Sequence, residues 1–425
     1  MKLATRQAST LLGGALLAQL VGLGASPMLT RLFKPDDFAA LALFGAVLAV
    51  LAVVAGGRYE LAVMLPKEDG DSIGLLALAL LLAAGLALAV ALLQGLAGEA
   101  LAARWHWHRA ELWLPLLAPA VLLSCALAAL GGWVNRQARY AALAASRLVQ
   151  ALAAAGSSLA LGAWGATAGG LVWGSCLGLL LGCGWLAVAS WRTPALRQGW
   201  RRLGWPVLAR VARQHADFPR VNLPHALLDT LQAAVLLSLL GAGWGATALG
   251  LYALVQRTVR APMAMLGASM GQVFQQRAAQ CHHAGQPLRP LLIAQWRQLL
   301  GWLLPMAAAI ATAPWTFALV FGETWREGGQ YALILLPWMA MNFLVSPLSQ
   351  LPLWLGRQRG ALVWGLAYQA AMLLPVLAAL GLGVGLPPAL LAQSICAATV
   401  LAGYAVWLLR IGSAAPGLPQ ASVHG

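Results

Sequence analysis

Residues 73–97 read IGLLALALLLAAGLALAVALLQGLA and contain no charged side chain. A helix of about 20 apolar residues matches the roughly 30 Å hydrocarbon core of a bilayer. Further apolar runs of similar length fill the chain, which is 61% hydrophobic and only 9% charged. This pattern predicts an all-α polytopic membrane protein with about twelve transmembrane helices. The expected spans are 8–28, 38–57, 73–97, 112–134, 142–163, 166–190, 223–241, 246–267, 298–320, 331–354, 361–382 and 387–409.

A basic stretch at 191–222 divides the apolar runs into two groups of six. It includes WRTPALRQGWRRLGWPVLARVARQH, where Arg and Trp are spaced as in a helix that lies in the membrane interface. We therefore predict an N-terminal six-helix bundle at 1–190, a basic cytoplasmic linker or interfacial helix at 191–222, and a C-terminal six-helix bundle at 223–425. Two such bundles are a common transporter plan, with the substrate site between them.

The formal charge of +15 would suggest nucleic-acid binding in a soluble chain, but the positions of the charges argue otherwise. If the N-terminus lies inside, most Lys and Arg residues fall in inner loops. The outer side then carries only Arg31, Lys34, Arg104, Arg109 and Arg326. The positive-inside rule therefore predicts cytoplasmic termini and an inner-membrane location, with membrane lipids and not nucleic acid as partners.

Small residues and prolines predict where helices pack and bend. Glycines every four residues form a flat stripe on the sixth span, where another backbone can approach closely: Gly170, Gly174, Gly178 and Gly182. Prolines within spans of the second half predict bends, either static or flexing: Pro305, Pro314, Pro347, Pro352 and Pro375. The five cysteines have no metal-ligand spacing and are expected to pack as small apolar residues.

Charges inside spans indicate function, because burying them in lipid is costly without a partner. Asp229 and Arg260 are expected at similar depths on neighbouring antiparallel spans, where they form a plausible ion pair. Arg257 lies about one turn nearer the membrane centre without an obvious acidic partner. Its planar guanidinium suits the phosphate oxygens of an anionic substrate, although snorkelling or a contact with helix-end carbonyls is the alternative.

Arg58 and Glu60 end the second span. If that span is a regular helix, residues two apart point to different faces, so the two side chains are not expected to pair. Topology accounts for Arg58, whereas Glu60 joins Asp229 as a candidate for an ion pair or for ion coupling. Arg31 closes the first span at the outer side, where an interfacial anchor is the alternative.

No cluster of side chains indicates catalysis, a metal or a cofactor. His106 and His108 are two residues apart without nearby acids or cysteines, which makes a poor metal site. No nucleophile–base constellation is recognisable, so the sequence predicts a protein that is not an enzyme.

Several stretches together resemble polysaccharide biosynthesis proteins of the O-antigen flippase (Wzx) type. They cover both halves of the chain: SPMLTRLFKPDDFAALALF, GRYELAVMLP, GLYALVQRTVRAPMAMLG, FGETWREGGQYALILLP and SPLSQLPLWLGRQRG. The resemblance implies the multidrug/oligosaccharidyl-lipid/polysaccharide (MOP) exporter superfamily, with two bundles forming a V. It also implies that Arg31, Arg58, Arg257 and Arg260 line a cavity and meet the diphosphate of a polyprenyl-linked glycan.

The expected function is therefore translocation of a polyprenyl-diphosphate-linked oligosaccharide by alternating access, for O-antigen, capsule or exopolysaccharide assembly. The polymerase and the chain-length regulator of the same pathway are expected partners. The alternatives are a MATE-like multidrug exporter, which should carry more acidic coupling residues, and a flippase for peptidoglycan lipid precursors. A membrane glycan polymerase is disfavoured because no large outer loop exists, and a structural scaffold would not explain Arg257.

Overall fold

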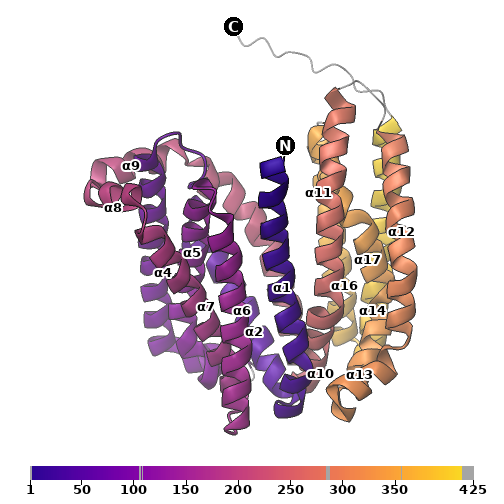
Figure 1. The fold of residues 1–425 in the computed structure, drawn as a ribbon. Helices are drawn as coiled ribbons and strands as arrows, with labels where there is room; N and C mark the ends of the chain where they lie inside the picture. Colours follow the sequence, from indigo (N-terminus) through magenta and orange to yellow (C-terminus); the bar gives the residue numbers. More distant parts are fainter. Residues whose placement is uncertain (1, 105–106, 108, 284–287, 356, 414–425) are drawn as a thin grey trace. The chain divides into compact units, whose positions relative to one another are not determined.

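The computed structural model describes residues 2–104, 107, 109–283, 288–355 and 357–413, and every regular element within them is a helix (Figure 1). The chain forms two compact units, Met1–Ala253 and Leu254–Gly425. The predicted fold class, an all-α polytopic membrane protein, is confirmed. The predicted division at 191–222 stays a prediction, because the boundary between the two units falls further along the chain, near the end of a long helix.

The first unit contains the helices that precede this boundary. They are α1 (Lys2–Leu32), α2 (Pro35–Ala55), α3 (Tyr59–Ala62), α4 (Asp69–Arg104), α5 (Ala110–Arg136), α6 (Tyr140–Ala163), α7 (Ala168–Trp191), α8 (Pro194–Arg201), α9 (Trp205–Gln214), the π-helical η1 (Phe218–Asn222) and α10 (Leu223–Val255), whose last two residues belong to the second unit.

The second unit begins within the last turn of α10. Its further elements are the π-helical η2 (Gln256–Arg260), α11 (Ala261–His283), α12 (Arg289–Ala311), α13 (Ala313–Phe321), η3 (Glu323–Trp325), α14 (Arg326–Val345), η4 (Ser346–Leu348), α15 (Leu351–Trp354), α16 (Gln358–Gly381) and α17 (Leu386–Ser413).

Within the described residues, nine helical segments are long and apolar enough to cross a membrane, and a bent pair makes ten. The bent pair joins Arg289–Ala311 to Ala313–Phe321 at 65°. One of the nine, Phe218–Gln275, covers two predicted spans, and the chain kinks between them at Gly245, whose φ of 88° and ψ of 171° are not helical. The predicted span at 142–163 forms a helix, α6, but is not among the segments that qualify as membrane spans. These two cases account for the difference from twelve.

Apolar side chains face outward as well as inward, as expected of a protein surrounded by lipid. On α4, Leu88, Leu92 and Leu96 follow one another at successive turns and are 62%, 58% and 87% exposed. Such a stripe is unfavourable in water but matches the hydrocarbon core. The opposite side of α4 packs on α5 through buried residues such as Ala79 and Ala83.

The glycine stripe predicted on the sixth span is confirmed as a packing surface between α6 and α7. A Cβ placed on Gly178 would lie 2.7 Å from the carbonyl oxygen of Gln150, and one on Gly174 would collide with Ser158. Ser146 donates a hydrogen bond of 2.9 Å to the carbonyl of Gly182. Glycine is needed here because the two helix backbones approach too closely for a side chain.

The second unit is centred on α14 and α17, which pack against each other, with α16 and α12 beside α17. Pro314 stands in the first turn of α13, directly after the 65° bend. Its missing N–H costs no intrahelical hydrogen bond there, because the first N–H groups of a helix have no partner within the helix. The prediction of a bend here is confirmed. Three of the five cysteines, Cys125, Cys176 and Cys183, are buried as expected of packing residues, whereas Cys281 is partly buried and Cys396 is exposed.

Candidate functional site

The connection between α2 and α4 is irregular in a way that positions two charged side chains. After α2 ends at Ala55, Gly57 and Arg58 both have left-handed backbone conformations, with φ of 57° and 64°. A non-glycine residue at positive φ costs about 1–2 kcal/mol, so surrounding contacts must hold Arg58 there. The short α3 then starts at Tyr59 in a new direction.

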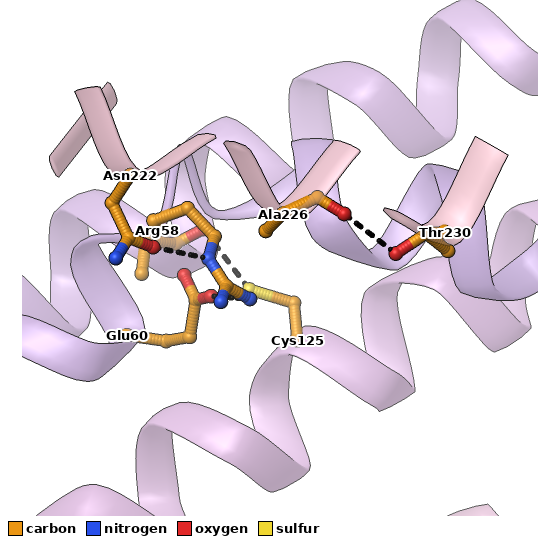
Figure 2. A network of polar contacts seen from close by, with 7 residues as sticks. Arg58, Glu60, Cys125, Asn222, Ala226 and Thr230 are labelled. Atoms are coloured by element: carbon orange, nitrogen blue, oxygen red, sulfur yellow. Dashed lines mark hydrogen bonds and ion pairs between the residues drawn. The ribbon is translucent and has the colours of Figure 1, made fainter. Parts of the chain in front are cut away.

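Arg58 makes two polar contacts from this turn, one of them to a residue far along the chain (Figure 2). Its Nε donates a hydrogen bond of 2.9 Å to Oδ1 of Asn222 in η1, and its Nη1 lies 3.8 Å from Oε1 of Glu60. The prediction that Arg58 and Glu60 do not pair is therefore wrong. It assumed a continuous helix, whereas the left-handed turn at Gly57 and Arg58 brings the two side chains together.

Glu60 is deeply buried, with its side chain 5% exposed. Its Oε2 has no hydrogen-bond partner among the described residues and lies against Gly56, where any Cβ would collide with it and would lie 2.9 Å from Sγ of Cys125. Burial raises the pKa of the Glu60 carboxyl, and its own backbone N–H and the Arg58 guanidinium offset part of that rise. Glu60 is thus a buried carboxyl whose Oε2 accepts no hydrogen bond from the described residues.

Neighbouring contacts fix this cluster in place. The hydroxyl of Tyr59 donates a hydrogen bond of 3.1 Å to the carbonyl of Ala212 in α9. The thiol of Cys125 in α5 donates to the carbonyl of Ala79 in α4, 3.6 Å away. The α2–α3 turn is therefore held by hydrogen bonds to α9 and η1, and α3 packs on α4 and α5.

Arg31 lies in the last turn of α1 and is exposed, where a cation interacts favourably with the helix dipole. The acidic residues that follow it have other partners. Asp37 accepts a hydrogen bond from the backbone N–H of Lys34 at 2.9 Å and pairs with Arg109 at 3.3 Å. Asp36 accepts a hydrogen bond from the Thr247 hydroxyl at 2.6 Å.

Arg257 and Arg260 both lie in η2, a π-helical turn within an otherwise α-helical run. Arg257 is half-buried, and its side chain makes no hydrogen bond or ion pair within the described part of the chain. Arg260 is exposed and its guanidinium lies 5.2 Å from the ring centre of Trp338, a cation–π contact. Of these two arginines, Arg257 is the one without a side-chain partner among the described residues.

The structure thus brings Arg58 and Glu60 together, whereas Arg31 stands at the end of α1. The predicted Asp229–Arg260 pair joins residues of different units and stays a prediction. Among the described residues no group of three His, Cys, Asp or Glu side chains is placed to hold a metal ion, and His106 and His108 lie outside the described residues.

Sequence reasoning missed Asn222 and both π-helical turns. A signal for the turns exists in the sequence, since Pro219 lies within η1 and Pro262 two residues after η2. A proline in a helix cannot donate the usual backbone hydrogen bond, and helix irregularities, including π-bulges, cluster around such positions. No comparable signal links Arg58 to a residue 164 positions away.

The fold is similar to those of solved polytopic membrane transporters. It is similar to an inward-facing MATE family multidrug transporter of the MOP superfamily, at 14% identity and a TM-score of 0.64 over 95% of this chain and 94% of that one. It is also similar to the lipid II flippase MurJ in an inward closed conformation. That match has 10% identity and a TM-score of 0.73 over 95% of this chain and 89% of the other.

The chain belongs to the polysaccharide biosynthesis protein family, whose model matches residues 28–328. A search of curated proteins finds no match. The family model and the solved structures together describe a polysaccharide biosynthesis protein with the fold of a polytopic membrane transporter.

Proposed function

We propose that this protein carries oligosaccharides linked to polyprenyl diphosphate across the bacterial inner membrane, for the assembly of a surface polysaccharide such as O-antigen, capsule or exopolysaccharide. The observation that carries the proposal is Arg257, a half-buried cation in a membrane-spanning run without a carboxylate partner among the described residues. Membership of the polysaccharide biosynthesis family supports the same substrate class.

The transport step has an energetic problem that arginines solve. A diphosphate carries negative charge into a medium where each unpaired charge costs several kcal/mol. A guanidinium presents donors in a planar fork that matches phosphate oxygens, so Arg257 lowers this cost when the head group passes. Arg58 would serve the same role at the α2–α3 turn, with Glu60 as the competing anion that holds it in the absence of substrate.

The mechanism would be alternating access without covalent chemistry, so the protein would not be an enzyme. Opening on the cytoplasmic side would admit the sugar head group while the polyprenyl tail stays in lipid. The positive-inside rule orients both termini and the basic 191–222 stretch toward the cytoplasm. Asp229 and Glu60 would be the groups that couple transport to an ion.

Substitution of Arg257 tests the proposal in cells that lack their own copy of the gene. Arg257→Ala should lower surface glycan by about 10- to 100-fold, the equivalent of one charged hydrogen-bonding contact, while protein level stays normal. Arg257→Lys should retain part of the activity. Arg277→Ala is the control, because Arg277 is an exposed arginine on the same helical run. Normal glycan with Arg257→Ala would refute this role for Arg257.

A flippase for peptidoglycan lipid precursors is the second candidate, and the similarity to MurJ favours it. The two functions differ in what depletion of the protein does to the cell. Loss of a surface-polysaccharide flippase should leave cells viable but without the glycan. If depletion stops growth and lyses cells that have no surface-polysaccharide genes, the peptidoglycan candidate replaces the first.

A further inference from the structure

An open groove of about 550 Å³ lies where α7 ends and α8 begins. Its lining consists of Ala187, Val188, Trp191, Arg192 and Arg197. Three of these residues are apolar and belong to the end of a membrane-spanning candidate, and the other two are arginines that follow it. An apolar wall and a cationic end therefore meet in one groove.

The apolar wall faces outward from the first unit. Val188 and Trp191 are 55% and 53% exposed, and Trp185 continues the same exposed face one turn earlier on α7. Tryptophan is enriched at the depth where hydrocarbon meets head groups, so Trp191 marks the interface end of this span. The wall is therefore placed to contact the upper part of an acyl chain.

The two arginines have no anion to neutralise them within the described residues. Other arginines near this end of the first unit do have one. Arg136 pairs with Asp69 at 3.0 Å, and Arg210 pairs with Asp71. The groove thus contains two cations and no carboxylate.

The position of Arg197 is fixed by how α8 packs on α4, at the same end of the first unit as α9 (Figure 1). Leu196 of α8 is 3% exposed, and Gly199 lies so close to Ile73 that a Cβ there would collide with its side chain. Because its neighbour Leu196 is buried, the backbone of Arg197 is held next to the groove, while the side chain of Arg197 is exposed.

We propose that this groove binds an anionic phospholipid, with its phosphate between Arg192 and Arg197 and an acyl chain along Ala187, Val188 and Trp191. The phosphodiester supplies the anion that the two arginines lack, and the chain covers the apolar wall. The site is formed by residues of the first unit, and none of them is among the residues proposed to meet the transported substrate. It would fix the α7–α8 junction to the leaflet that contains acidic lipids.

The test compares two phospholipids with identical chains, dioleoylphosphatidylglycerol and dioleoylphosphatidylcholine, bound to the full-length protein in detergent and counted by native mass spectrometry. The protein should retain the anionic lipid preferentially. Each arginine near an anionic head group contributes about fivefold, so Arg192→Gln with Arg197→Gln should weaken retention about 30-fold. The matched control is Arg201→Gln with Arg202→Gln, which removes the same charge from exposed residues outside the groove.

A second variant tests the apolar half without changing any charge. Ala187→Trp fills the groove and should weaken retention of phosphatidylglycerol, and it decides the matter if the double arginine variant fails to fold. Equal retention of the two lipids, equal loss in the control pair, or full retention by Ala187→Trp would each overturn the proposal. Displacement of phosphatidylglycerol by a lower concentration of undecaprenyl phosphate would also overturn it, because the groove would then belong to a polyprenyl tail.

Discussion

Replacing Arg58 with alanine should destabilise the protein in a strongly pH-dependent way. The substitution removes the hydrogen bond to Asn222 and the ion pair to Glu60. The first contact is exposed and its loss costs about 0.5–1 kcal/mol at any pH. The second matters more, because Glu60 is 5% exposed and would become a buried carboxylate without a cation.

The size of this effect has a ceiling set by protonation. Glu60 can always take up a proton instead of remaining charged, and doing so costs about 1.4 kcal/mol per pH unit above the ordinary pKa of 4.5. The ionic part of the loss therefore cannot exceed about 4 kcal/mol at pH 7.5 or about 1.4 kcal/mol at pH 5.5. Burial already raises the pKa of Glu60 in the native protein, so the native protein already bears part of the free-energy cost of burying this carboxylate. The substitution adds only the remainder. We expect about 1–3 kcal/mol at pH 7.5.

The sign of the pH dependence follows from linkage. A carboxyl whose pKa is raised by folding stabilises the folded state most at acidic pH, and this advantage is lost as pH rises through the unfolded pKa toward the folded one. Removal of Arg58 raises the pKa of Glu60 in the folded protein further. The folded state of the variant therefore continues to lose stability up to a higher pH than that of the native protein. The apparent Tm of Arg58→Ala in detergent should therefore fall well below that of the native protein at pH 7.5 and only slightly below it at pH 5.5.

Glu60→Gln provides the control for this prediction, because glutamine keeps the shape of the side chain without its charge. Combined with Arg58→Ala, it should restore most of the Tm at pH 7.5 and remove the difference between the two pH values. A loss of Tm in Arg58→Ala that is the same at both pH values would refute the ion-pair reasoning and leave Asn222 as the partner that matters.

Two further predictions concern packing. Gly178→Ala should cost about 1–3 kcal/mol and lower the Tm, because its Cβ would press on Gln150, whereas Gly184→Ala on the same helix has no atom within 4 Å and should be neutral or stabilising. Val211→Asp should release α9 and expose 202–216 to limited proteolysis, since Val211 is fully buried, while Arg210→Gln removes a partly exposed ion pair worth less than about 1 kcal/mol and should not.

Apolar run length was sufficient to predict the helices but not how they join. The span expected at 73–97 is the centre of α4, which extends to Asp69 and Arg104 because helices continue beyond the hydrocarbon core. The spans expected at 223–241 and 246–267 are separated by a kink at Gly245, whose φ of 88° and ψ of 171° interrupt the helix. The hydrophobicity of a segment predicts that it lies in lipid, but it does not predict where the backbone leaves the helical conformation.

The candidate site was predictable residue by residue but not as a set of contacts. The predicted depth of Arg257 in the membrane identified it as a candidate, because a charge in the hydrocarbon core is costly without a partner. The Arg58–Glu60 pair escaped prediction because helical spacing was assumed across Gly57, where the backbone is left-handed. The Gly56-Gly57 sequence is only a weak signal of this turn, because Gly131-Gly132 lies within α5 without interrupting it.

Three residues discussed above, Arg58, Asn222 and Arg257, lie where helices are irregular, and this has a physical reason. A regular helix satisfies its own backbone in lipid, so a departure from it persists only where other contacts compensate. Arg58 stands in a left-handed turn, while Asn222 and Arg257 stand in π-helical turns, which often mark functional sites. Arg58 and Asn222 compensate each other through a hydrogen bond, whereas no such bond is found for Arg257 among the described residues. An anionic substrate at Arg257 would supply the missing compensation, so its binding should order η2 and slow amide exchange there.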